Sequence, residues 1–129
     1  MKREAELKSA VMRELHRQCP SWLVLLQATA GAPDRLIVGA SRVSAWEFKH
    51  GTPRFISKGN QELFCMRLDQ SGIRTRYVIW QESQTFQRTM IIHPKALHER
   101  DGWKVIPEIW CVGYDHRWLV SQIRKAHGV

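Results

Sequence analysis

The sequence predicts an α/β fold in which helices cover both faces of a central sheet. Its 129 residues, 43% hydrophobic and 25% charged, have the composition of one soluble globular domain. Helical and strand-like patterns occur in the order helix, three strands, helix, strand, which is typical of α/β architecture. In the second and third strands apolar residues fall on both faces, as Leu36 and Val38 do on one face and Ile37 on the other. A sheet with two apolar faces must be covered on both sides.

The first expected element is an amphipathic helix over residues 2–18. Leu7, Val11 and Leu15 recur at intervals of four with polar residues between them, which gives the helix one apolar side. Pro20 ends this helix.

Three strands are expected next. They cover residues 22–29, 34–38 and 43–49, and Gly31, Pro33 and Gly39 mark the turns between them. If the second and third strands form a hairpin whose turn is centred on Ala40 and Ser41, Asp34 lies opposite Glu47.

The rest of the chain shows further helical and strand-like segments. These are a helix over 59–70, a strand over 76–80, a strand over 90–92, a short helix over 94–100 and a helix over 115–127. Gly72 ends the first of these helices and Asp115 caps the last. Because the sequence contains no repeat, low-complexity tract or linker, we expect a single domain over 1–129.

Charge and cysteine usage limit the class of protein. The net charge of +8 and the pI of about 9.9 favour a polyanionic partner, above all nucleic acid, although a basic surface can also serve solubility alone. Cys19, Cys65 and Cys111 are odd in number and widely spaced, so we expect reduced, structural thiols. The longest apolar run, WLVLL, is too short to span a bilayer, and the N-terminal segment lacks the apolar core of a secretory signal. We expect a cytoplasmic protein with no membrane partner.

Charged residues in the second and third strands are the main functional signal. Glu47 and Lys49 share one face of a strand, and the hairpin register brings Asp34 opposite Glu47. Two carboxylates that face each other repel, unless one is protonated or a cation lies between them. Such a pair suits Mg²⁺, and a metal ion beside a lysine suits phosphodiester hydrolysis. The alternative is that Asp34 caps a turn while Glu47 and Lys49 form an exposed ion pair.

These residues resemble the PD-(D/E)xK nuclease superfamily, and within it the VRR-NUC family of stand-alone, phage-type nucleases, which are similar to Holliday-junction resolvases. The matching segments are GAPD at 31–34, EFK at 47–49 and Gln61 in KGNQELF, followed by SGIRTRYVIW at 71–80. The resemblance covers about residues 4–82. It implies a restriction-endonuclease-like αβββαβ core with a central mixed sheet, and an accessory helical extension over about 86–129.

The resemblance also implies roles for individual residues. Asp34, Glu47 and the main-chain carbonyl of Phe48 would bind Mg²⁺ or Mn²⁺. Lys49 would be the catalytic lysine, which orients the attacking water or stabilises the transition state. Gln61 would lie near the active site.

Family members use a further glutamate from the first helix, and Glu4, Glu6 and Glu14 compete for this role. A helical wheel places Glu4 and Glu14 on the apolar side and Glu6 away from it. We assign the role to Glu4, because EAEL ahead of the apolar positions resembles the helix start of archaeal-type Holliday-junction resolvases. The alternative for Glu4 is a favourable negative charge at a helix N-terminus.

Several basic residues are candidates for phosphate contacts. Arg35 follows Asp34 where family members often have an apolar residue. The other candidates are Arg54, Lys58, Arg74 and Arg76, although a solvated charged surface explains them nearly as well.

We therefore expect a Mg²⁺- or Mn²⁺-dependent DNA endonuclease that hydrolyses phosphodiester bonds. Known relatives act as homodimers on branched or flapped DNA, so the resemblance implies a structure-specific enzyme for branched, flapped or four-way junction DNA, in the bacterial host cell if the protein is phage-encoded. Two alternatives remain open: a non-catalytic basic nucleic-acid-binding module of the same fold, and a sequence-specific restriction or nicking enzyme.

Overall fold

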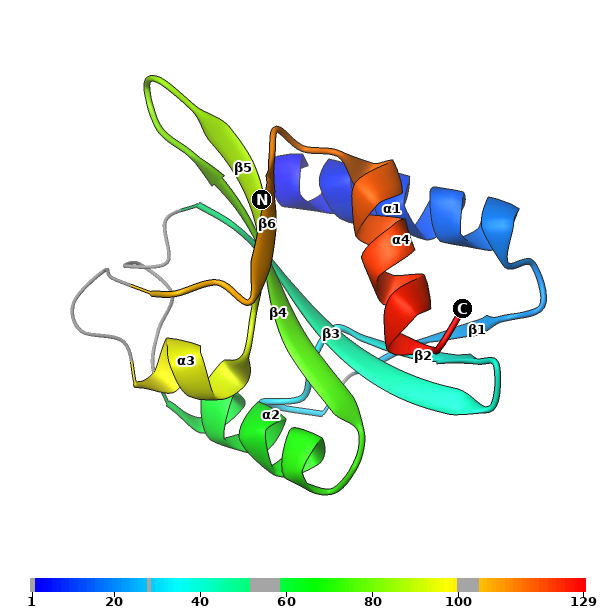
Figure 1. The fold of residues 1–129 in the computed structure, drawn as a ribbon. Helices are drawn as coiled ribbons and strands as arrows, with labels where there is room; N and C mark the ends of the chain where they lie inside the picture. The colour runs from blue at the N-terminus through cyan, green and yellow to red at the C-terminus, as the bar shows by residue number, and fades with distance from the viewer. Residues whose placement is uncertain (1, 28, 52–58, 100–104) are drawn as a thin grey trace.

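A computed structural model describes residues 2–27, 29–51, 59–99 and 105–129 (Figure 1). Its elements are α1 (Lys2–Gln18), β1 (Leu23–Leu26), β2 (Arg35–Gly39), β3 (Arg42–His50), α2 (Asn60–Gln70), β4 (Arg74–Glu82), β5 (Gln87–Ile92), α3 (Pro94–His98), β6 (Ile109–Val112) and α4 (His116–Ala126). The strands form one sheet in the order β1-β2-β3-β4-β5-β6. The β3–β4 pairing is parallel and the other four pairings are antiparallel. The prediction of an α/β fold with a mixed sheet flanked by helices is confirmed.

The hairpin of β2 and β3 has the register that the sequence predicts. Ala40 and Ser41 form its turn with φ of 50° and 62°, as a two-residue hairpin turn of the I′ type requires. Arg35 pairs with Trp46, so Asp34, one residue earlier, lies opposite Glu47, one residue later.

Two pairs of helices cover the sheet (Figure 1). On one face α1 and α4 pack together on a buried cluster that includes Val11, Leu15, Phe48 and Trp80. On the other face α2 and α3 cover a second buried cluster, formed by Cys65, Tyr77, Ile79, Met90, Ile92 and Leu97. The apolar residues on both sides of the strands explain this three-layer arrangement.

The segment after residue 86 differs from the helical extension that the resemblance implied. It contains α3 and α4, but its strands β5 and β6 also extend the central sheet beyond β4. Met90 and Ile92 are fully buried in the second cluster, so β5 is part of the core, whereas β6 is a mostly exposed edge strand. None of the helices in the described residues is long and apolar enough to cross a membrane.

Candidate active site

The candidate site lies at the C-terminal end of β3, where this strand extends beyond β2. Two carboxylates accept hydrogen bonds from the free edge of the strand there. Asp34 Oδ2 accepts from the main-chain N–H of Phe48 at 3.2 Å, and Glu4 Oε1 accepts from that of His50 at 3.1 Å. The acidic side chains therefore take the place of a neighbouring strand, which brings α1 and the segment before β2 to the same edge.

Asp34 and Glu47 are joined directly. The main-chain N–H of Asp34 donates to Glu47 Oε1 at 2.9 Å. Lys49 Nζ lies 2.9 Å from the other carboxylate oxygen, Oε2. Asp34, Glu47 and Lys49 thus meet in one place, as the sequence analysis expected.

Burial and neighbouring charges shift the pKa values of Glu47 and Lys49. Glu47 is only 2% exposed, and burial, helped by the negative charge of Asp34, raises its pKa above the ordinary value. Burial alone would lower the pKa of Lys49, but the hydrogen bond with Glu47 and the charges of Glu47, Glu4 and Asp34 raise it. Lys49 is therefore a cation at neutral pH, suited to stabilising negative charge rather than to accepting a proton.

The three glutamates of α1 lie in different surroundings. Glu4 is the one at the end of β3, through its bond with His50. Glu14 instead binds Arg17 and Gln18 on its own helix and lies 3.5 Å from Arg117 of α4. Glu6 is exposed.

Lys8 is a site residue that the sequence analysis missed. Its Nζ lies 3.5 Å from Asp34 Oδ2 and 4.0 Å from Glu4 Oε2. The spacing of four residues between Glu4 and Lys8 was a usable signal, because it places both side chains on the same side of a helix.

Gln61 lies in the first turn of α2 and is half-buried. The loop that leads to Asp34 approaches this turn: a Cβ at Gly31, whose φ is +82°, would lie 3.9 Å from the Cα of Gln61. The described contacts include none that ties the Gln61 side chain to Asp34, Glu47 or Lys49, so its place in the site remains a prediction.

The donor atoms at this edge fit a hard divalent cation. Asp34 and Glu47 supply carboxylate oxygens, and Phe48 presents its carbonyl on the same edge of β3 as its N–H, which faces Asp34. Mg²⁺ in proteins takes one or two carboxylates and keeps several waters. Within the described ranges no three Asp, Glu, His or Cys residues are close enough to hold a metal ion by themselves. The role of Glu4 as a further ligand stays a prediction.

The basic residues expected to contact phosphate have different surroundings. Arg35 Nη1 donates to the main-chain carbonyl of Asp34 at 3.0 Å, which keeps it beside the site. Arg54 and Lys58 lie outside the described residues. Arg74 is half-exposed and lies 3.5 Å from Glu108.

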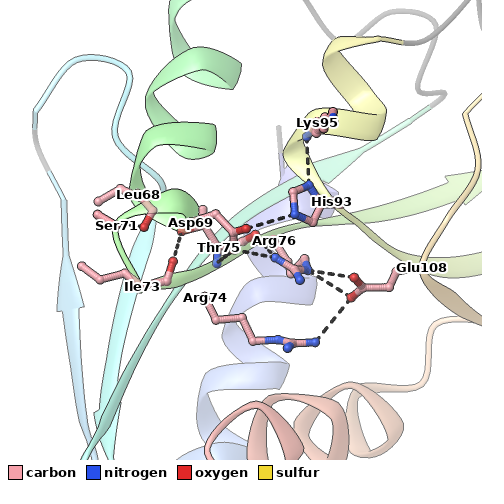
Figure 2. Close-up of polar contacts among 10 residues, drawn as sticks. All are labelled: Leu68, Asp69, Ser71, Ile73, Arg74, Thr75, Arg76, His93, Lys95 and Glu108. Atoms are coloured by element: carbon pink, nitrogen blue, oxygen red, sulfur yellow. Dashed lines mark hydrogen bonds and ion pairs between the residues drawn. The ribbon is translucent and has the colours of Figure 1, made fainter.

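Arg76 belongs to a network of ion pairs near the start of β4 (Figure 2). It is 9% exposed, and its guanidinium lies 2.7 Å from Asp69 Oδ1 and 3.0 Å from Glu108 Oε1. Asp69 also accepts from His93 at 3.0 Å. Because Nε and Nη1 donate inside the protein, these contacts favour a structural role for Arg76, and its contact with phosphate stays a prediction.

The comparisons with known proteins add no family to this geometry. No protein-family model matches the chain, and no curated protein shows significant similarity to it.

Proposed function

We propose that the protein is a Mg²⁺- or Mn²⁺-dependent endonuclease that hydrolyses phosphodiester bonds in DNA. The observation that carries this proposal is the meeting of Asp34, Glu47 and Lys49 at the end of β3. The order helix, three strands, helix, strand of the first 82 residues supports a restriction-endonuclease-like core.

In the proposed mechanism Asp34, Glu47 and the Phe48 carbonyl hold the metal ion. When bound, the ion lowers the pKa of a water molecule and polarises a phosphoryl oxygen. The ammonium of Lys49 stabilises the negative charge that develops on the phosphate, because it is held in place by Glu47 and needs no reorganisation. The amide of Gln61 contributes a further polar group from α2.

The basic charge of the protein supports DNA as the substrate, with a net charge of +8 and Arg35 beside the site. Converging carboxylates disfavour a module that only binds DNA, because they repel phosphate. Following the resemblance, we propose branched, flapped or four-way junction DNA as the preferred form.

A homodimer is also proposed, because symmetric cutting of a junction needs two sites. The edge strand β1 supports this: its four apolar residues are all exposed, with Leu23 at 60% and Leu26 at 72%. A row of unpaired main-chain groups with apolar side chains favours pairing with another strand.

The test is cleavage of linear, flapped and four-way DNA of one sequence, with Mg²⁺, with Mn²⁺ and with EDTA. Lys49→Ala is compared with Lys125→Ala, which removes the same charge from an exposed position of α4. We expect metal-dependent cutting that Lys49→Ala lowers by about 10²–10³-fold and Lys125→Ala leaves nearly unchanged. Cutting in EDTA, or an undiminished Lys49→Ala, would overturn the mechanism. Binding of every DNA without cutting would point to a non-catalytic module, and cutting at one sequence in all DNA forms to a sequence-specific enzyme.

A further inference from the structure

Lys8 lies at the site but has no role in the proposed mechanism. It extends from α1 with 19% of its side chain exposed, and its ammonium lies between carboxylates of two different segments. Lys8 Nζ lies 3.5 Å from Oδ2 of Asp34, the residue before β2. It lies 4.0 Å from Oε2 of Glu4, on the preceding turn of α1.

Each carboxylate at the site has a lysine beside it. Lys49 forms an ion pair with Glu47, while Lys8 forms ion pairs with both Asp34 and Glu4. The three carboxylates and the two ammonium groups together carry one net negative charge. A divalent cation that took the place of the Lys8 charge would make the group electrically neutral.

The Lys8 ammonium and a metal ion would compete for the same oxygen atom. Asp34 Oδ2 already accepts the Phe48 N–H, and the Lys8 ammonium lies 3.5 Å from it. A positive charge this close to a ligand oxygen opposes the binding of a metal cation there. The Lys8 side chain has space to move, because a groove of about 430 Å³ lies between α1 and the first two strands. Lys8, Met12, Val24, Leu26 and Arg35 are among its lining residues.

We propose that Lys8 is the resident cation of the metal-free site. It holds Glu4 and Asp34 together until the metal binds, and the metal displaces it into the groove. Lys8 is thus a positioning residue that sets the concentration of metal ion at which the site becomes occupied. The inference rests on the proposed function, because it takes Asp34 as a metal ligand.

The experiment measures Mn²⁺ binding by calorimetry without DNA, and thermal unfolding in EDTA. We expect Lys8→Met to bind Mn²⁺ about tenfold more tightly than the wild type, because the competing charge is gone. Its Tm in EDTA should fall, because Glu4 and Asp34 then repel each other without a counter-charge. Lys8→Arg, which keeps the charge, should retain weaker, wild-type-like binding, and Lys125→Met controls for net charge.

The outcomes separate the two proposals. Equal or weaker Mn²⁺ binding by folded Lys8→Met, with saturable binding by the wild type, overturns the role of Lys8 and leaves the nuclease proposal intact. Absence of saturable Mn²⁺ binding in the wild type and in every variant overturns both. Binding that only Lys8→Met shows supports the role of Lys8, because it means that the wild-type lysine excludes the metal.

Discussion

The main-chain N–H of Asp34 donates to Oε1 of Glu47 at 2.9 Å, so the segment before β2 is fastened to a carboxylate of β3. A second bond joins the same two segments in the opposite direction, since Asp34 Oδ2 accepts from the main-chain N–H of Phe48, the residue after Glu47. Each acidic side chain therefore binds the main chain of the other segment. The geometry of the candidate site is consequently part of the fold of the hairpin.

This reciprocal pairing predicts different results for two substitutions of Glu47. Glu47→Gln keeps an oxygen that accepts the Asp34 N–H but loses the charge, so we expect a folded protein with Mn²⁺ binding lost and DNA cleavage lowered by about 10²-fold or more. Glu47→Ala leaves that N–H without its partner, and we expect the free energy of unfolding to fall by about 1–3 kcal/mol. Urea denaturation and cleavage assays measure both effects. Wild-type cleavage by Glu47→Gln would contradict the assignment.

The lowered pKa of Asp69 predicts that its contribution to the stability of the folded protein depends on pH. Burial alone would raise its pKa, but hydrogen bonds from the Thr75 N–H and Arg76, with the charges of Arg76 and His93, lower it (Figure 2). A carboxyl with a lowered pKa stabilises the folded state above its ordinary pKa of 3.8, and this stabilisation is lost as pH falls through the lower, folded-state pKa.

We therefore expect Asp69→Asn to lower the free energy of unfolding by about 1–3 kcal/mol at pH 7, and the difference from the wild type to shrink below pH 3.8. Urea denaturation across this pH range measures it. Glu99→Gln removes the same charge from an exposed position and serves as the control. A pH-independent difference would show that the charge of Asp69 is not the cause.

The burial of Cys65 predicts that its thiol reacts slowly with alkylating reagents. The residue is fully buried on the inner side of α2, and burial raises its pKa to about 11. Because the thiolate is the reactive form, we expect Cys65 to resist iodoacetamide at pH 8 in the folded protein and to react in urea. Peptide mass spectrometry identifies the labelled cysteine. Labelling of Cys65 as fast as that of the half-exposed Cys111 would contradict this packing.

The edge strand β1 predicts where a homodimer would form. Leu26→Lys places a charge on the most exposed residue of this edge, and we expect it to shift a dimer to monomer in sedimentation measurements. Val112→Lys, on the opposite edge strand β6 at 78% exposure, is the matched control. A dimer that survives Leu26→Lys but not Val112→Lys would move the interface to β6.

The sequence by itself determined the local parts of the candidate site. A two-residue turn at Ala40 and Ser41 sets the register of the hairpin, which fixes Asp34 against Glu47. The alternation of side chains along a strand then places Lys49 on the side of Glu47. These relationships depend on residues close together in the chain, so periodicity and turn chemistry suffice to predict them.

The tertiary structure decided what depends on distant segments. The choice of Glu4 over Glu14, and the position of Lys8, follow from how α1 crosses the free end of β3. Arg76 forms ion pairs inside the protein because the segment before β6 and the end of α2 place Glu108 and Asp69 beside it. Such contacts follow from the packing of separate elements, which the charges and periodicity of any one segment do not encode.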